Sequence, residues 1–326
     1  MNAHLERTVG AMGDAGVDVL LLGRDANARF VSAADRLSVS GSRAFAPGCV
    51  VVRETGGVHL LSISDDGIPA DIPPEHFFPI SWNPVNLLGA ITAMPGVATA
   101  RRIGVDGLTP LFTQLAQAFL PEAELVDGES IMREVRRVKS LDDIDAIRAA
   151  VAVLGDALGA AAAALAAGVR EVELKGIFEE QMVAHGVRSP AFEATFCVAT
   201  KGSAPRAFIS DRVVAAGDVV HIRAGVLRHG WEGSVARTRT CGGESPAVPA
   251  AHAETIAAAR SGATVGDLRA SGATVDGVGI GHEELADHDT LEPGMVLWIE
   301  RWSDPVLVGD TVVVTENEPE VLTSSM

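Results

Sequence analysis

Residues 217–240, GDVVHIRAGVLRHGWEGSVARTRT, decide the fold of this chain. Branched apolar residues gather at 219–222, and residues 235–240 alternate in polarity. Both patterns are typical of strands, and glycines at positions 230 and 233 indicate a turn between them. The stretch therefore predicts two short strands joined by a glycine-bearing turn.

Composition bounds the class of protein. The chain has 326 residues, of which 47% are hydrophobic, enough for two ordinary domains with a sizeable core. The formal net charge is −17, which argues against binding to nucleic acid or to an anionic membrane surface. The chain contains no tyrosine, so no phenol can serve as a proton donor in a site.

The cysteines and the apolar segments indicate the cellular compartment in which we expect the protein. Cys49, Cys197 and Cys241 are widely spaced and form no CxxC pair, which suits a reducing cytoplasm and small core residues. The N-terminus shows no basic region followed by a long apolar segment, so we expect no signal peptide. The most apolar run, residues 151–167, is interrupted by Asp156 and predicts a buried helix instead of a membrane span.

Residues 1–138 alternate between predicted strands and helices, which favours an α/β domain with a parallel or mixed sheet. We expect a hairpin around Gly56 within residues 49–64. The other predicted strands cover residues 17–23, 28–33, 101–107 and 123–128, and the predicted helices cover residues 4–15, 84–93 and 108–119.

Residues 139–326 form the second predicted domain. The basic stretch 131–140 is expected to be a joint, and Ser140 with Asp143 predicts a capping box that opens a helix. Helices are expected at 140–167, 168–186 and 250–261, with only a short connector after the last. Further strands are expected at 291–302 and 308–323.

Motifs along the chain resemble the pita-bread fold family, the M24 type of peptidase that includes creatinase, prolidase and aminopeptidase P. The hairpin at 217–240 keeps the glycines, the aromatic Trp231 and the pair Arg237-Thr238 of the family's metal-site hairpin. DGVGIGHE at 276–283, LEPGMVLWIE at 291–300 and the closing strand at 308–323 follow in family order. The resemblance implies an α/β N-terminal domain, residues 1–138, and an α+β pita-bread C-terminal domain, residues 139–326.

The family's two metal ions are held by two Asp, one His and two Glu. By resemblance those positions fall on Arg223, Ser234, Val278, Glu300 and Gly309, so one ligand of five remains. Two unit charges about 4 Å apart repel by roughly 4 kcal/mol at an effective dielectric near 20, and a dication beside a guanidinium by about 8. We therefore expect no metal or other cofactor, and we expect Arg223 to pair with Glu300, because an unpaired buried carboxylate is costly.

The resemblance also supplies candidate site residues. Proton transfer is assigned to Glu300, with His282 or His221, and ligand binding to cationic and aromatic residues on segments that line the family's cavity: Arg206, Arg223, Trp231, Arg237 and Arg301. Such arginines suit a carboxylate or phosphate. Structural alternatives stay open for each of them. Arg206 stands where the enzymes of the family have a His, which weakens the case for catalysis.

Three functions are compared. The favoured one is a metal-independent enzyme acting on a small amide- or carboxylate-bearing molecule, with creatinase-like C–N hydrolysis. The alternative is an inactive pseudoenzyme that binds a ligand or serves as a scaffold. A conventional Xaa-Pro metallopeptidase comes last. We expect a small, anionic ligand, a homodimer and a cytoplasmic location, with no nucleic acid or membrane as partner.

Overall fold

The computed structural model describes residues 2–35, 47–81 and 83–326. Contacts divide the chain into two compact units, Met1–Arg136 and Arg137–Met326. The α/β and pita-bread classes expected for the two parts are those observed. Each unit is described by itself below.

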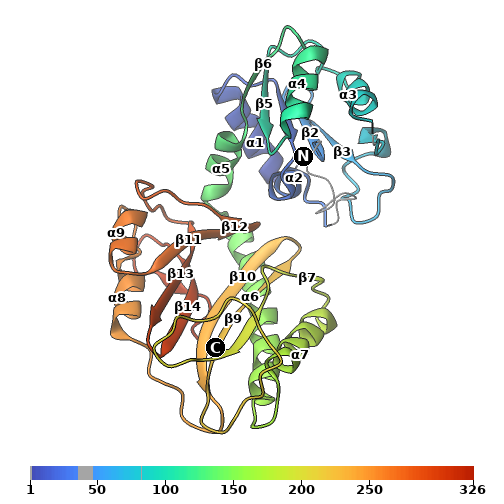
Figure 1. Cartoon of the computed structure of the whole chain (residues 1–326). Coiled ribbons are helices and arrows are strands. Elements are labelled where there is room, and N and C mark those ends of the chain that lie inside the picture. Colours follow the sequence, from blue (N-terminus) through green and yellow to red (C-terminus); the bar gives the residue numbers. More distant parts are fainter. Residues whose placement is uncertain (1, 36–46, 82) are drawn as a thin grey trace. The chain divides into compact units, whose positions relative to one another are not determined.

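The first unit contains a six-stranded sheet with strand order β4-β3-β2-β1-β5-β6 (Figure 1). β1 pairs in parallel with β5 and antiparallel with β2, so the sheet is mixed. Its strands are β1 Val19–Leu22, β2 Cys49–Val52, β3 Gly57–Leu61, β4 Phe77–Phe78, β5 Arg102–Asp106 and β6 Glu124–Asp127. Its helices are α1 Ala3–Asp14, α2 Asp25–Ser32, α3 Pro84–Thr92, α4 Pro110–Phe119 and α5 Glu129–Arg137, with a short 3-10 turn at Pro74–His76.

Two expectations for this part of the chain are wrong. Residues 28–33, predicted as a strand, lie mostly in the helix α2. The carboxylate of Asp106, distant in sequence, accepts hydrogen bonds from the backbone N–H groups of Gly23 and Arg24 just before α2 and so satisfies donors at its start. An ion pair between Arg29 and Asp25, 2.6 Å long, adds support one turn apart.

The second error is the basic joint at 131–140, most of which is the helix α5. Asp127 accepts hydrogen bonds from the backbone N–H groups of Glu129, at 2.9 Å, and Ser130, which opens this helix. Met132 and Val135 are buried on one face, and the charged residues occupy much of the other. The run of charges therefore marks an amphipathic helix.

The predicted hairpin is confirmed in the second unit. β9 Val219–Arg228 and β10 Trp231–Thr240 are ten residues each, longer than expected, and pair antiparallel throughout. The turn between them consists of His229 and Gly230, with φ values of 50° and 87°. Two consecutive left-handed residues are typical of the tightest hairpin turns, whose twist matches that of the strands.

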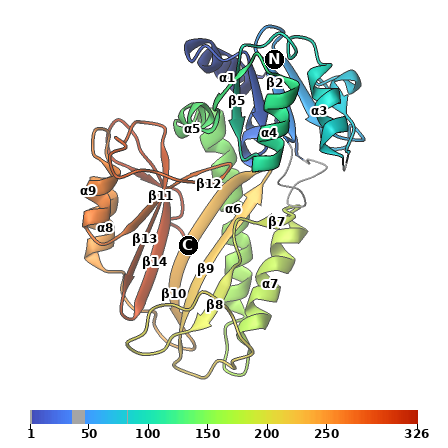
Figure 2. The ribbon, with the colours of Figure 1, turned by 45° about the horizontal axis from the view of Figure 1, so that its top comes forward.

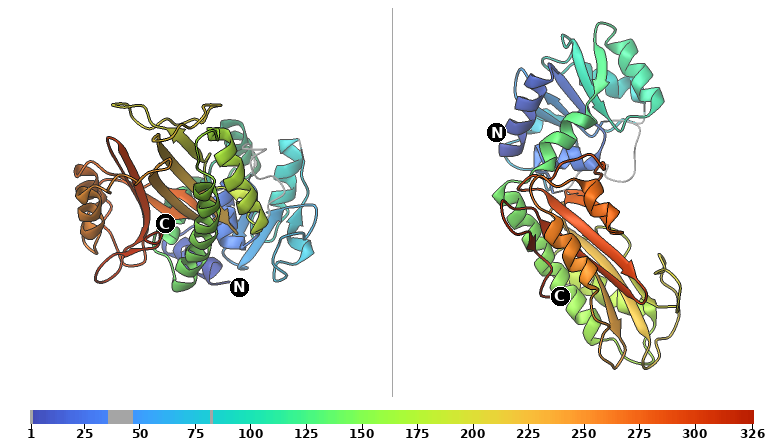
Figure 3. Two further views of the ribbon diagram at one scale, coloured as in Figure 1. Left: turned by 90° about the horizontal axis from the view of Figure 1, so that it is seen from below. Right: turned by 90° about the vertical axis from the view of Figure 1, so that its left-hand side faces the viewer.

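This hairpin lies inside a nine-stranded sheet with the order β12-β11-β13-β14-β10-β9-β7, while β15 pairs with β14 and β8 with β9. Helices α6 and α7 flank the half that contains β9 and β10, and α8 and α9 flank the half that contains β11 and β13 (Figures 1 and 2). Figure 3 shows from two further sides that the sheet is curled. The remaining strands are β7 Ser189–Pro190, β8 Thr195–Val198, β11 Thr274–Gly279, β12 Gly281–Glu283, β13 Val296–Ser303, β14 Val306–Val313 and β15 Glu320–Val321.

The helices are α6 Leu141–Ala163, α7 Glu171–Ala184, α8 Ala250–Ala258 and α9 Val265–Ala270. The predicted capping box is confirmed at α6, where Ser140 and Asp143 bond each other's backbone N–H groups. The stretch after α8 is not a plain connector, because it contains α9. Thr264 and Asp267 form a capping box at its start, which explains how so short a helix is held.

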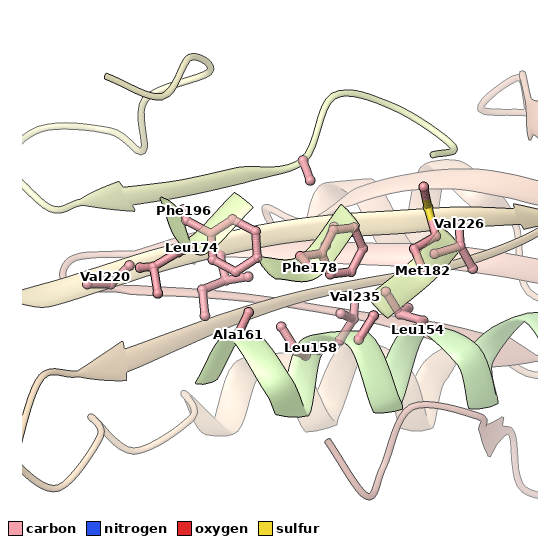
Figure 4. Packing of buried hydrophobic residues seen from close by; sticks show 14 of the residues in the cluster. Leu154, Leu158, Ala161, Leu174, Phe178, Met182, Phe196, Val220, Val226 and Val235 are labelled. Carbon is pink, nitrogen blue, oxygen red and sulfur yellow. The ribbon is translucent and has the colours of Figure 1, made fainter. Parts of the chain in front are cut away.

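α6 is the core helix of this unit. By length and composition alone it is apolar enough to cross a membrane, and it is the one such helix in the described ranges. In the structure its side chains Leu154 and Leu158 pack with Phe178 of α7 and with Val220 and Val235 of the hairpin (Figure 4). Its hydrophobicity is thus used in the core of the domain.

The hairpin approaches α6 so closely that one position must lack a side chain. A Cβ atom at Gly233 would lie 2.8 Å from the backbone nitrogen of Val151 and 3.0 Å from the carbonyl carbon of Ala150. Gly176, in the middle of α7, has nothing within 4 Å of the same imagined atom. The two glycines therefore serve different purposes, and only the first is required by packing.

We expect Gly233→Ala to lower the free energy of unfolding by about 1–3 kcal/mol, because it forces strand and helix apart. Gly176→Ala should raise it by about 0.5–1 kcal/mol, because alanine is the better helix former. Denaturant unfolding of both variants beside the parent protein checks this pair. A Gly233→Ala variant as stable as the parent would contradict the close approach.

Candidate functional site

The site is built on one row of residues across the curled sheet. Arg223 on β9 lies opposite Ala236 on β10, Ala236 lies opposite Gly309 on β14, and Gly309 lies opposite Glu300 on β13. Residues directly opposite each other project to the same face of a sheet, so all four share one face, called here the site face. The opposite face carries apolar side chains, such as Ile222, that pack with residues of α6 and α7.

Arg223 and Glu300 meet across this row. Their strands are three strand spacings apart, about 14 Å in a flat sheet. The side chains still come together, with Nε of Arg223 2.9 Å from Oε2 of Glu300. The two positions between them carry only a methyl group and a hydrogen atom, and the sheet is curled. The predicted pairing of Arg223 with Glu300 is confirmed.

Phe192 and Glu300 hold the guanidinium from two sides. The ring centroid of Phe192 lies 5.0 Å from Cζ of Arg223, a cation–π contact. The Arg223 side chain is 44% exposed, whereas that of Glu300 is 16% exposed. Burial raises the pKa of Glu300, the charge of Arg223 opposes that shift, and the charge of Asp276 adds to it.

An apolar cluster occupies the neighbouring ligand positions. A Cβ atom at Gly309 would lie 2.6 Å from two ring carbons of Trp298, so the indole covers this position. Val278, at the position of the family's ligand His, is fully buried and belongs with Trp298 to a cluster that includes Ile144 and Ile147 of α6. A carboxylate at position 309 would displace the indole.

Ser234 is joined to an acid that the sequence analysis did not single out. Its Oγ donates a 2.5 Å hydrogen bond to Oε1 of Glu232, which lies two residues away on the same strand face. Glu232 is only 4% exposed, and burial raises its pKa, although the hydrogen bond from Ser234 and the charges of His282 and Arg223 oppose the shift. The site face therefore contains two carboxyl groups with raised pKa values.

The predicted acid–base histidines have different surroundings. His282 is opposite Val278 on the neighbouring strand, its side chain is 57% exposed, and its Nε2 lies 3.9 Å from Oδ2 of Asp276. His221 is buried, with Nε2 2.9 Å from the carbonyl oxygen of Pro305 and its ring against Trp302. Burial lowers the pKa of His221, which favours the neutral ring.

Three of the predicted ligand-binding arginines are engaged elsewhere. Arg237 follows Ala236 and so projects to the other face, where it donates to Asp310 and to the carbonyl oxygens of Gly309 and Thr323. Arg301 follows Glu300 and bonds Ser271 and Thr255. Arg206 is paired with the buried Glu171 at the start of α7.

Trp231 begins β10 and forms an isolated bridge with Ile280.

The structure brings together four of the predicted residues, Arg223, Ser234, Glu300 and His282. Glu232, Asp276, Phe192 and Trp298 are additional members of the site. Simple alternation along each strand could have found Glu232 from Ser234. It could also have separated Arg301 from Glu300.

The side chains at the family's ligand positions do not fit two metal ions. Across residues 2–35, 47–81 and 83–326, no group of three or more His, Cys, Asp or Glu side chains is arranged to hold a metal ion. Divalent cations need several carboxylates for coordination and for charge compensation. Here a guanidinium contacts the single remaining carboxylate, and an indole covers one of the other positions.

The chain is similar to curated Xaa-Pro dipeptidases. It is 22% identical to that of Pyrococcus horikoshii over 361 aligned positions, covering 100% of this chain and 98% of the relative. It is 25% identical to that of Pyrococcus furiosus over 229 positions, covering 60% of this chain and 66% of the relative.

Solved structures agree in fold. The prolidase of Pyrococcus horikoshii superposes with a TM-score of 0.79 at 19% identity, covering 100% of this chain and 99% of that one. The Xaa-Pro dipeptidase of Bacillus anthracis gives a TM-score of 0.79 at 18% identity, covering 99% and 97%. These likenesses show the pita-bread fold.

The comparisons contradict the favoured function. Neither the metal-independent, creatinase-like hydrolase nor the pseudoenzyme is retained, because the relatives are named Xaa-Pro dipeptidases, the class ranked last from sequence. The ranking relied mainly on the residues at the five ligand positions, and it underestimated the similarity to Xaa-Pro dipeptidases along the rest of the chain.

The family assignment is direct. The sequence profile of metallopeptidase family M24 matches residues 145–316, more than half of the chain and nearly all of its second unit. The matched segment contains the hairpin, the site row, most of α6 and all of α7, α8 and α9. This chain belongs to metallopeptidase family M24.

Proposed function

We propose that this chain acts on Xaa-Pro dipeptides. The observation that carries the proposal is the correspondence with the Xaa-Pro dipeptidase of Pyrococcus horikoshii along the full length of both chains. The fold supports it, because the polar residues of the site face occupy the positions at which the family's motifs place the site.

The chemistry of the site face suits a small zwitterion. A dipeptide has a carboxylate at one end and an ammonium group at the other. Arg223 offers a partly exposed cation, and Glu300 offers a carboxyl group beside it. Oε2 of Glu300 lies 2.9 Å from Nε of Arg223, and a carboxylate can accept several hydrogen bonds, so Glu300 has the capacity to accept one from a ligand N–H as well.

In this proposal Glu300 also transfers protons, and His282 is the second group that can do so. Burial raises the pKa of Glu300, and a carboxylate with a raised pKa is a better base than an ordinary one. No step is assigned to a metal ion, because the donor set at the ligand positions does not fit one. His221 is assigned no step, since its ring is held by Pro305.

The oligomeric state and the cellular location of the protein are part of the same proposal. We infer a cytoplasmic homodimer, as expected from sequence. The three cysteines are free and buried, which is compatible with a reducing compartment. Sedimentation velocity at micromolar concentration measures the mass directly, and a single monomeric species would exclude the dimer.

The substrate class is tested by proline release. Purified protein is incubated with Ala-Pro and Leu-Pro, and in parallel with Pro-Ala and Ala-Ala. Parallel series contain Mn²⁺, Co²⁺, Zn²⁺ or EDTA. We expect hydrolysis of the Xaa-Pro peptides to exceed that of the others by at least about tenfold in kcat/KM, a difference of roughly 1.4 kcal/mol. Equal rates for all four peptides, or no release in any series by folded protein, would refute the proposal.

The role of Glu300 is tested by Glu300→Gln. General acid–base catalysis contributes about 10²–10⁴ in rate, so kcat should fall by at least about 100-fold. A base must be ionised, so parent activity should decline as pH falls through the raised pKa of Glu300, and this limb should be absent from any residual activity of the variant. Glu284→Gln, at an exposed position nearby, is the control and should leave the profile unchanged. An unchanged rate in Glu300→Gln would remove Glu300 from the reaction.

A further inference from the structure

We propose that the Arg223 guanidinium is a ligand-binding group of this site and takes a carboxylate through its two terminal nitrogens. A residue that replaces a ligand Asp of the family would thus supply the positive charge that holds the substrate. The inference rests on the proposed function for the identity of the ligand, a dipeptide, but its geometry concerns any small carboxylate.

The guanidinium is held in one orientation before a ligand arrives. Nε is used by Glu300 at 2.9 Å, which fixes one edge of the plane. The Phe192 ring, with its centroid 5.0 Å from Cζ, restricts the group further. A group that is already oriented loses less conformational freedom on binding, so more of the interaction is available for affinity.

The terminal nitrogens are available. Among the described residues, Nη1 and Nη2 of Arg223 donate no hydrogen bond and form no ion pair, and the side chain is 44% exposed. Arg237, by contrast, is only 10% exposed and donates to four main-chain oxygens in addition to Asp310. Both terminal nitrogens of Arg237 are thus occupied by acceptors, and those of Arg223 are not.

The end of a guanidinium matches a carboxylate in shape. Two parallel N–H groups face two oxygens, and such bidentate pairs are the strongest ordinary hydrogen bonds in proteins. A lysine offers the same charge, but its ammonium group lacks the planar pair of parallel N–H donors that a guanidinium has. The geometry therefore points to a free carboxylate over a neutral amide as the recognised group.

A purely structural ion pair is the competing interpretation. Pairing with the largely buried Glu300 accounts for Nε of Arg223, but it leaves the two terminal nitrogens without an acceptor. If the pair were only structural, a charge at this position would not influence which ligands bind.

Calorimetric titration with glycyl-proline, its C-terminal amide and glycyl-alanine tests the inference on four proteins: the parent, Arg223→Gln, Arg223→Lys and the control Arg212→Gln. Arg212 is an exposed arginine of the same unit and has no part in the site. The parent and the control should bind the free acid at least about tenfold more tightly than the amide, because hydrogen bonds between two charged groups are stronger than those to a neutral amide.

Arg223→Gln should lose that preference, and Arg223→Lys should retain part of it. Thermal unfolding of each variant shows that it is folded. The inference is overturned if folded Arg223→Gln keeps the parent affinity and the preference for the acid, or if none of the three probes binds the parent.

The outcomes also separate this inference from the proposed function. Binding of glycyl-alanine and glycyl-proline with equal affinity, both dependent on Arg223, would support the carboxylate site and refute the preference for proline. Binding of glycyl-proline alone, independent of Arg223, would support the substrate class and refute the carboxylate site.

Discussion

The contact between Arg223 and Glu300 depends on the two residues that separate them. Ala236 and Gly309 lie between these side chains in one register row of the sheet, and neither has an extended side chain. The long side chains meet across this row, with Nε of Arg223 2.9 Å from Oε2 of Glu300. Larger residues at both positions would keep the charges apart, and the carboxylate of Glu300 would be buried without its partner.

The same row shows that a member of the family can keep the backbone while the side chains at the ligand positions differ. The hairpin, the sheet order and both helix pairs follow the pita-bread pattern, and the chain belongs to metallopeptidase family M24. Yet the indole of Trp298 covers Gly309, and Val278 is buried in an apolar cluster. The backbone therefore identifies the family of the chain, whereas the side chains of the site determine what the site can bind.

Sequence patterns predicted the hairpin well, because its signals are local: β-branched runs, alternation and a turn residue that favours positive φ. They failed at α2, where residues 28–33 resemble a strand but the start of the helix is capped by Asp106 from another strand. A contact between residues so far apart in sequence leaves no local pattern.

Some contacts of the site could likewise be predicted from the sequence, and others could not. The pairing of Arg223 with Glu300 could be predicted, because family motifs gave both positions and the cost of a buried charge required a partner. The surroundings of Arg206 could not, since its partner Glu171 belongs to a different helix. Glu232 and Trp298 were missed, although each lies two residues from a recognised position and alternation places each on the same face.

A crystal structure of the protein with a bound dipeptide tests the central claim most directly. The account predicts that the ligand carboxylate lies against Nη1 and Nη2 of Arg223 while Nε remains on Glu300. A carboxylate bound elsewhere, with the terminal nitrogens of Arg223 facing only solvent, would contradict it.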